Sequence, residues 1–329
     1  MKPHVCILLG TFNGGQYLRQ QLESFVAQTG VNWSLRVSDD GSDDDSRDII
    51  VSFIKAHPDR DIRFYEGPKQ GSAANFLSLL GQSDLPARAW VALSDQDDVW
   101  LPNRLEHAVQ VMMAQMKTGG GQGCVYASRT ILTNADLALR GPSCRHPKAP
   151  DFGNALVQNV LAGNTMVLDP AAAALLQATA PAAMRAGVPH HDWWIYLLLS
   201  GAGAVMINDD RPGLYYRQHK KNHLGANRGL GKAWSRFAMI WDRRYADWIG
   251  RNLAALTEMS DLLTPENRAR ATLFSAWLSR RHSCPGSGAG FGGPETMGPK
   301  LGDLGQIGVW RQSRAGNLML HLAAAAGRL

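Results

Sequence analysis

Residues 4–26 read HVCILLGTFNGGQYLRQQLESFV, and they contain the first strand and the first helix of the expected fold. Residues 5–9 form a short, continuous apolar run, which is typical of a strand buried on both faces. Over residues 17–26 the apolar side chains recur at the three- and four-residue spacing of a helix. A polar loop rich in glycine joins the two, so this stretch predicts a strand–loop–helix unit.

The same alternation of short apolar runs and helical patterns continues through the first hundred residues. Ser46 is expected as a helix N-cap, and Ser72 is expected to open a further helix. The predicted strands are 35–38, 62–65 and 90–93, and the predicted helices are 46–54, 72–80 and 103–116. Alternation of this kind indicates an α/β fold, in which helices cover both faces of a largely parallel sheet.

The rest of the chain is less regular in the middle and helical at the end. The predicted strands are 124–127, 164–168, 204–207 and 214–217, and the predicted helices are 170–178, 193–199, 234–263, 265–281 and about 309–326. A segment rich in Gly and Pro, residues 283–309, is expected to be a loop or disordered. The change in pattern predicts an α/β domain at 1–228 and a basic helical extension at 229–329.

The bulk composition indicates a folded protein with an uneven charge. The 329 residues are 45% hydrophobic and 19% charged, and the net charge is +6. Residues 1–210 contain 16 Lys and Arg against 21 Asp and Glu, a balance of −5, whereas residues 211–329 contain 18 against 7, a balance of +11. The excess of cations near the C-terminus suits contact with phosphate groups of a ligand or of an anionic membrane. An ordinary soluble basic surface is the alternative.

Targeting signals and cysteine pairs are not evident in the sequence. No stretch approaches the ~20 apolar residues that span a bilayer, and the N-terminal segment fits a buried strand better than a signal peptide. The four cysteines are scattered without a CxxC pair, so neither a disulfide framework nor a zinc site is expected. A cytoplasmic protein is therefore predicted.

Three polar loops follow predicted strands, and in an open α/β sheet ligands bind at the carboxyl ends of the strands. The loops are GTFNGG at 10–15, SDDGS at 38–42 and SDQDDVW at 94–100. The first is neither a GxGxxG dinucleotide motif nor a phosphate-binding P-loop, and by itself it fits an ordinary turn. The convergence of all three loops on one edge favours a binding cleft there.

The acidic pair Asp95 and Asp97 is the most informative feature of these loops. Carboxylates two residues apart at a strand end can both face one cleft, and Mg²⁺ or Mn²⁺ binds through such oxygen ligands together with substrate phosphates. A bound metal would neutralise a diphosphate leaving group. The alternative is that Asp97 or Asp98 caps the following helix, and we expect one acid of this loop to do so.

Ordered blocks of this sequence resemble bacterial family 2 glycosyltransferases of the rhamnosyltransferase-like group. The blocks are ILLGTFNGGQYLRQQLESFVAQT, VSDDGSDDDS, QGSAANF, ALSDQDDVWLPNRL, and later HHDWW at 190–194 and YRQH at 216–219. They extend over roughly residues 4–225, with the order and spacing of that group. The resemblance implies a GT-A fold, a Rossmann-like mixed sheet that binds nucleotide-diphosphate sugars, with a helical extension after it.

The resemblance also implies roles for individual residues. It places Thr11, Asn13 and Asp40 in the nucleoside pocket, with Asp40 near the base. Asp95 and Asp97 correspond to the DxD pair, with Asp97 as the more direct metal ligand. His219 falls where related enzymes place a histidine on the metal or the diphosphate. Here Lys220 and Lys221 follow it in place of the small and Asn residues usual in the group, and His223 is a second candidate for this role.

Asp192 falls where the family keeps its general base. Inversion requires one carboxylate that removes the proton of the acceptor hydroxyl while its oxygen attacks the anomeric carbon. His191 is expected to orient Asp192. Trp193 and Trp194 suit stacking on a sugar, although aromatic residues before an apolar helix are more often core, and we expect at least one of them in the core.

The sequence therefore predicts an inverting, metal-dependent glycosyltransferase that acts in surface polysaccharide synthesis. The donor is expected to be a dTDP-sugar such as dTDP-rhamnose, or a UDP-sugar, and the acceptor a saccharide or a polyprenyl-diphosphate-linked glycan. The alternative is a catalytically inactive nucleotide-sugar-binding module of the same fold. Nucleic-acid binding is not expected, because the basic region has no recognition module. Peripheral contact with the inner face of the cell membrane and packing of the C-terminal helices on the first domain are both open.

Overall fold

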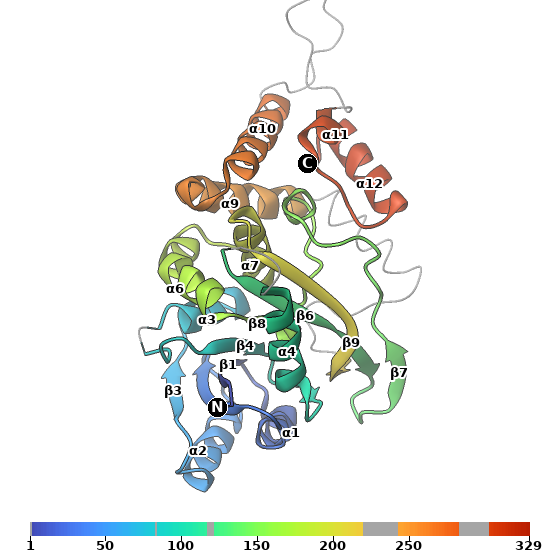
Figure 1. Cartoon of the computed structure of the whole chain (residues 1–329). Helices are drawn as coiled ribbons and strands as arrows, with labels where there is room; N and C mark the ends of the chain where they lie inside the picture. Colours follow the sequence, from blue (N-terminus) through green and yellow to red (C-terminus); the bar gives the residue numbers. More distant parts are fainter. Residues whose placement is uncertain (1, 83, 117–121, 220–242, 283–302) are drawn as a thin grey trace, which may run out of the picture.

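The computed structural model describes residues 2–82, 84–116, 122–219, 243–282 and 303–329 (Figure 1). Several expectations lie outside these residues: the first part of the helix at 234–263, most of the loop at 283–309, the boundary at 228/229, and the side chains of Lys220, Lys221 and His223. The division into domains at 1–228 and 229–329 therefore stays a prediction.

Within the described residues, nine strands form one mixed sheet. The strands are β1 (His4–Thr11), β2 (Asn32–Asp39), β3 (Ile62–Glu66), β4 (Trp90–Ser94), β5 (Val99–Trp100), β6 (Cys124–Thr133), β7 (Leu139–Pro142), β8 (Val167–Leu168) and β9 (Val205–Arg217). Their order is β3-β2-β1-β4-β8-β6-β9-β5, with β7 paired to β6. β1 to β4 pair in parallel, as do β6 and β9, whereas β8, β5 and β7 are antiparallel to their neighbours.

The apolar run of β1 lies at the centre of this sheet, where both faces are covered. Cys6 and Leu8 belong to one hydrophobic core, and Val5, Ile7 and Leu9 belong to the other. Successive side chains of a strand point to opposite faces, so a strand between two cores is apolar at every position. The apolar run of β1 therefore indicates a sheet that is covered on both faces, as expected.

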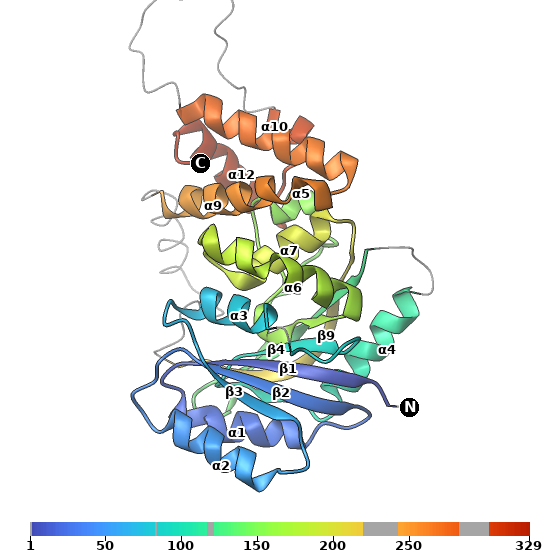
Figure 2. The same cartoon turned by 90° about the vertical axis from the view of Figure 1, so that its left-hand side faces the viewer.

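Helices cover both faces of the sheet (Figure 2). One core contains residues of α1 (Gly15–Val26), α2 (Ser46–Ala56) and α4 (Arg104–Met116). The other contains residues of α3 (Ser72–Leu80), α5 (Phe152–Ala155), α6 (Pro170–Arg185) and α7 (His191–Gly201). The predicted α/β class and the two helical layers are confirmed.

The C-terminal helices pack on the α7 side of the sheet (Figures 1 and 2). They are α9 (Arg244–Glu258), α10 (Pro265–His282), α11 (Asp303–Ile307) and α12 (Arg314–Ala325). Buried residues Leu253 of α9, Trp277 of α10 and Leu320 of α12 belong to the same core as Trp194 of α7. The helical extension is confirmed, and it shares one continuous core with the α/β part. In the portion of the chain that the structure describes, no helix has the length and apolarity needed to cross a membrane.

Several local predictions need correction. The strands expected at 204–207 and 214–217 are one long strand, β9, and only Val167–Leu168 of the segment expected at 164–168 is a strand. Residues 303–307, expected within the Gly/Pro-rich loop, form α11 because Leu304 is buried in the core. Ser46 is the first residue of α2, and Asp45 takes the N-cap position without a side-chain bond.

Candidate active site

The strands with polar loops at their ends meet at one edge of the sheet. β1, β2 and β4 are mutually parallel, and β9 has the same direction because β8 is antiparallel to both β4 and β6. Their carboxyl ends therefore lie on the same edge, which is where the open α/β sheet binds ligands. This edge brings together the three loops that the sequence indicated and the end of β9, which carries Arg217.

The side chain of Gln96 joins the loop after β4 to the loop after β1. Its amide oxygen accepts from the Phe12 N–H at 2.8 Å, and its amide nitrogen donates to the Phe12 carbonyl oxygen at 2.9 Å. Gly14 leaves room for this amide, since a Cβ on Gly14 would lie 2.2 Å from Gln96 Oε1. Sequence reasoning gave Gln96 no role, and its place inside the Asp-Gln-Asp triplet was the only signal.

Asn13 links the loop after β1 to the loop after β2. Its N–H donates to Ser42 Oγ at 2.8 Å, and its side-chain oxygen accepts from the Asp43 N–H at 2.9 Å. The φ of Asn13 is 49°, in the left-handed region that Asn tolerates better than most residues. The two loops that are expected to surround the nucleoside therefore form one bonded unit.

The neighbouring acids Asp39 and Asp40 have separate tasks. Asp39 accepts from Thr11 Oγ1 at 2.8 Å and from the Ser42 N–H at 2.8 Å, so it fixes the end of β2. Asp40 accepts from the N–H groups of Lys69 and Gly71, both at 2.7 Å, and thereby holds the loop between β3 and α3. Sequence reasoning missed Asp39, which is the partner of the buried Thr11 hydroxyl. The predicted pocket roles of Thr11 and Asp40 stay predictions.

Asp95, Asp97 and Asp98 form an acidic cluster. One oxygen of each carboxylate lies within 4.8 Å of an oxygen of the other two. Burial, together with the charges of Asp97 and Asp192, raises the pKa of Asp95 to about 7. Burial and the same kind of repulsion also raise the pKa of Asp98 well above its ordinary value. Three half-buried or buried carboxylates that repel one another fit a hard divalent cation, which prefers oxygen ligands and would offset this repulsion.

The expected helix-capping role of an acid in this loop is wrong. Asp98 is 0% exposed, and it accepts from Asn164 Nδ2 at 2.6 Å. Asn164 is held in turn by Arg104, which donates to the Asn164 carbonyl oxygen at 2.8 Å. Asp97 pairs with His219 instead of with α4. Because Asn164 and His219 come from distant segments, the cluster is fixed by tertiary contacts, and α4 contributes through the side chain of its first residue, Arg104, and not by receiving a cap from an acid.

His219 lies beside the acidic cluster, and its role at the metal or the diphosphate stays a prediction. Its Nε2 is 2.7 Å from Asp97 Oδ2, and its ring lies on Tyr17 with centroids 5.0 Å apart. Arg217, a buried residue with no role assigned from sequence, donates from Nε to the Asp97 carbonyl oxygen at 2.9 Å. Its guanidinium also lies 4.3 Å from the centroid of the Tyr17 ring. The end of β9 therefore holds the backbone and the side chain of Asp97.

Asp192 stands in the first turn of α7, close enough to the acidic cluster for its charge to raise the pKa of Asp95. Gly163 lies against it, since a Cβ on Gly163 would lie 3.0 Å from Asp192 Cβ and 2.7 Å from His191 Nε2. The adjacent residue Asn164 donates to Asp98 at 2.6 Å, so residues 163–164 link the predicted base to the acidic cluster. Asp192 accepts from the N–H of Trp193 at 2.7 Å.

The neighbours of Asp192 are core residues. The His191 ring stacks on Phe76 with centroids 4.1 Å apart, and burial lowers its pKa to about 4, so it is neutral near pH 7. Its ring nitrogen Nε2 points at Gly163 and forms no hydrogen bond with Asp192, so the expected orienting role is not seen. Trp193 and Trp194 are both buried, and Trp193 Nε1 donates to the Ala155 carbonyl oxygen at 2.7 Å. The expectation that at least one Trp is core is confirmed for both.

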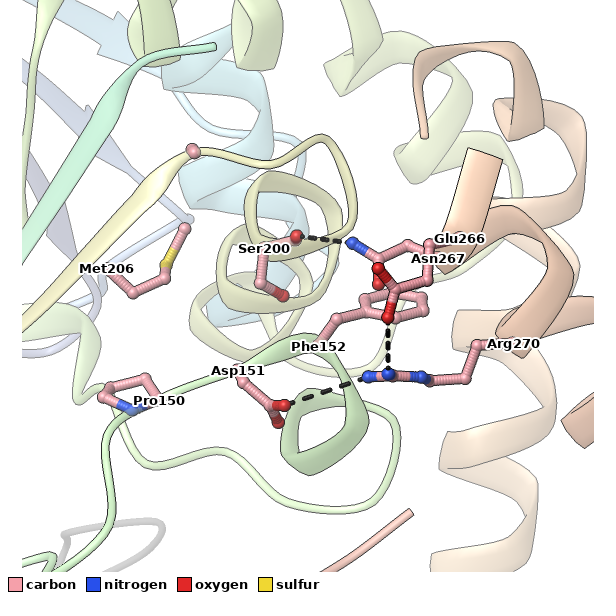
Figure 3. Close-up of a pocket in the computed structure, with 9 residues that line it drawn as sticks. Pro150, Asp151, Phe152, Ser200, Met206, Glu266, Asn267 and Arg270 are labelled. Carbon is pink, nitrogen blue, oxygen red and sulfur yellow. Dashed lines mark hydrogen bonds and ion pairs between the residues drawn. The ribbon is translucent and has the colours of Figure 1, made fainter. Parts of the chain in front are cut away.

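A separate cavity of about 280 Å³ lies between α10 and the start of α5 (Figure 3). Met206 lines it at the start of β9, whereas Arg217 of the acidic site is at the other end of that strand. Inside it, Arg270 pairs with Asp151 at 3.8 Å and with Glu266 at 3.1 Å. The guanidinium of Arg270 thus forms ion pairs with two carboxylates. This cavity is not part of the site at the sheet edge.

Comparison with known proteins identifies the family. Residues 6–176 match the family described as Glycosyl transferase family 2. The dTDP-rhamnosyl transferase RfbG of Shigella flexneri is 23% identical over 269 residues, which are 77% of this chain and 86% of that relative. An uncharacterised glycosyltransferase of Nostoc is 28% identical over 170 residues, 50% of this chain and 48% of that relative. The solved mannosyltransferase PcManGT from Pyrobaculum calidifontis, in complex with GDP-Man and Mn2+, is 14% identical, with a TM-score of 0.49 over 100% of this chain and 87% of its own.

Proposed function

This chain belongs to glycosyl transferase family 2, and from that premise we propose that it transfers a sugar with inversion from a nucleotide diphosphate to a glycan hydroxyl. The observation that carries the proposal is the position of Asp192 against Gly163, whose neighbour Asn164 donates to Asp98 of the acidic cluster, together with the effect of the Asp192 charge on Asp95. A base and a set of metal-binding carboxylates are the two groups that such a direct displacement needs. The same arrangement argues against an inactive binding module, which has no use for Asp192.

The division of labour follows from the contacts. The bonded loops that contain Thr11, Asn13 and Asp40 would surround the nucleoside. Asp95 and Asp97 would hold Mg²⁺ or Mn²⁺, with His219 beside them at the diphosphate. When bound, the metal supplies positive charge to the departing nucleotide diphosphate.

Asp192 would act on the acceptor. Its carboxylate takes the proton of the acceptor hydroxyl while that oxygen bonds to the anomeric carbon and the bond to the diphosphate oxygen breaks. One displacement inverts the anomeric centre and leaves no covalent intermediate. The nucleotide diphosphate departs with the electron pair, and Asp192 releases the proton to solvent after the product leaves.

The donor is the first property to test. A dTDP-sugar, with dTDP-rhamnose as the first candidate, or a UDP-sugar is expected to raise the melting temperature of the protein in the presence of Mn²⁺ or Mg²⁺. A ligand at about 100 times its Kd stabilises the folded state by about 2.7 kcal/mol, which amounts to a shift of several degrees. The measurement is a thermal-shift panel of nucleotide sugars with each metal, and the control is the same panel with EDTA.

Release of free nucleotide diphosphate in the presence of candidate acceptors then separates the enzyme from an inactive module. A donor that stabilises the protein and is turned over supports the transferase. Stabilisation without release from any donor and acceptor pair, across saccharides and polyprenyl-diphosphate-linked glycans, would favour the inactive module. Failure of every nucleotide sugar to stabilise the protein with either metal would contradict the proposed donor site.

The surface of α12 supports peripheral contact with a membrane that carries the acceptor. Leu318 and Leu322 are 60% and 53% exposed, and they lie one turn apart on the same face of the helix. Exposed Arg314 stands at the start of this helix, in the C-terminal region with a charge balance of +11. Apolar side chains among cations suit the surface of an anionic bilayer, where each cation contributes about 1 kcal/mol.

We expect the full-length protein to float with anionic liposomes at low salt and to dissociate at high salt, because salt screens the attraction of cations to lipid. The double substitution Leu318→Glu/Leu322→Glu is expected to abolish flotation. The matched control is Leu139→Glu, which changes a 70% exposed leucine of β7. A full-length protein that remains soluble at low salt, or equal effects of the two variants, would contradict membrane contact through α12.

A further inference from the structure

Two aromatic rings of α9 lie against the residues on either side of the pair His191–Asp192. Trp248 meets the ring of His190 edge-on, with centroids 4.6 Å apart and an interplanar angle of 86°. Tyr245 lies roughly parallel to Trp193, with centroids 6.0 Å apart and an angle of 25°. Tyr245 and Trp248 are three residues apart on α9 and therefore share one face of the helix. The extension thus contacts the start of α7 on both sides of Asp192.

Tyr245 is itself held by the segment that follows α11. Its hydroxyl donates to the Val157 carbonyl oxygen and accepts from Arg311, which also donates to the Val157 oxygen at 3.0 Å. Next to Arg311, the Trp310 carbonyl oxygen accepts from Asn154 Nδ2 at 3.1 Å. Two parts of the extension, α9 and residues 310–311, therefore meet at the turn that follows α5.

The same turn bonds to the residue after Asp192. Trp193 Nε1 donates to the Ala155 carbonyl oxygen at 2.7 Å, so Ala155 and Val157 connect Trp193 and Tyr245 through short polar contacts as well as through their rings. Trp193 is 4% exposed, which leaves it little freedom to shift. A displacement of Tyr245 or Trp248 would therefore move the backbone that carries Asp192.

The start of α7 depends on this packing because it lacks a capping side chain. His190 is its N-cap residue and forms no side-chain cap hydrogen bond. The carboxylate of Asp192 accepts from the N–H of the adjacent Trp193, a local bond that does not fix the position of the helix end. A first turn without a cap is held by tertiary contacts, and here the rings of α9 provide them together with Phe76 on His191 and Gly163 on Asp192.

We infer that Tyr245 and Trp248 are positioning residues for Asp192, so that the C-terminal extension is part of the construction of the active site. The inference rests on the proposed role of Asp192 as the base. The match to the family ends at residue 176, before Asp192 and before α9, so this role belongs to the part of the chain beyond that match. A misplacement of a reacting group by 1 Å can slow a reaction by about 10²-fold.

The test compares Trp248→Leu with Trp248→Phe in the full-length protein. Leucine removes the ring that meets His190, and kcat is expected to fall by about 10- to 10²-fold while the Kd of the donor changes less than about twofold. Phenylalanine keeps a ring, and it should retain most of kcat. The matched control is Trp277→Leu in α10, where a buried Trp stacks on Phe274 of its own helix. This control should change the melting temperature and leave kcat of the folded protein near that of wild type.

A double-mutant comparison shows whether Trp248 acts through Asp192. In an Asp192→Asn background, Trp248→Leu should cause no further loss of kcat, because the group that it positions is already removed. A further loss equal to that in the wild-type background, or a loss of donor affinity in parallel with kcat, would overturn the inference. Normal turnover of the single variant Asp192→Asn would instead refute the base assignment.

If Trp248→Leu does not fold, Tyr245→Phe is the alternative variant that tests the positioning role of α9. This change retains the ring that faces Trp193 and removes the hydroxyl that joins Val157 to Arg311. We expect a several-fold fall in kcat with unchanged donor Kd. A folded Tyr245→Phe enzyme with the kcat of wild type would overturn the inference without need of the Trp248→Leu variant.

Discussion

Asp97→Asn is expected to abolish detectable sugar transfer and to remove the gain in nucleotide affinity that metal provides. The substitution leaves Asp95 and Asp98 in the cluster but replaces a carboxylate that also pairs with His219 at 2.7 Å. Loss of one preorganised electrostatic contact to a developing charge costs roughly 10²–10³-fold in kcat. Here the loss weakens both the cluster and the placement of His219, so we expect an effect at or above that range.

The measurement is the Kd of the nucleotide diphosphate with Mn²⁺ and with EDTA, alongside the rate of transfer. The matched control is Asp43→Asn, which removes an exposed acid from the loop after β2 at the same edge of the sheet. This control should retain the response of nucleotide affinity to metal. An Asp97→Asn protein whose nucleotide affinity still rises with Mn²⁺ as in wild type would refute the metal-ligand assignment.

The parts of the fold that could be predicted from sequence are the elements whose burial determines their own pattern of apolar and polar residues. Residues 5–9 of β1 are all apolar because each face of the strand meets a core, so this run alone indicates a buried strand. β9 was predicted as two strands because polar residues 208–211 interrupt it. There the strand contains a register shift, and Asp209 pairs with His107 at 2.7 Å and with Tyr126 at 3.0 Å. Such pairing across elements has no signature in the local sequence.

The short elements were predicted with wrong bounds or not at all, for a related reason. β8 contains only Val167 and Leu168, and it exists because it bridges β4 and β6 in the sheet. α11 lies next to a Gly/Pro-rich segment, and the burial of Leu304 makes it a helix. In both cases the tertiary contact determines the local structure. Sequence patterns report the long elements well because those elements repeat the pattern several times.

The candidate site shows the same limit. The motifs identified the residue types and the loops, and the structure brings Asp95, Asp97, His219 and Asp192 together as the motifs suggested. The residues that hold them come from positions 66 to 120 residues away, as with Asn164 on Asp98 and Arg217 on Asp97. A side chain that supports a site through one hydrogen bond looks in sequence like any other polar residue. Arg217 and Gln96 stand inside quoted motifs, but only the structure shows the contacts that give them a role.

Asp192→Asn is expected to bind the donor with wild-type affinity and to transfer sugar roughly 10²–10⁴-fold more slowly, the contribution of one general base. The amide cannot accept the proton of the acceptor hydroxyl, but it has nearly the same shape as the carboxylate and can still accept the Trp193 N–H bond at the start of α7. It also removes a negative charge that raises the pKa of Asp95. Asp95 should therefore give up its proton at lower pH, and metal-dependent donor binding should not weaken.

The measurements are single-turnover transfer and the Kd of the donor in the presence of Mn²⁺. Asp209→Asn is the matched control, because it changes a half-buried acid that pairs with His107 and Tyr126 near the middle of β9. A slow Asp192→Asn enzyme with normal donor Kd, next to a control with normal turnover, is the expected pattern. Near-normal transfer by Asp192→Asn would mean that another group removes the proton, and equal losses in donor binding and in transfer would mean that Asp192 serves the donor instead of the acceptor.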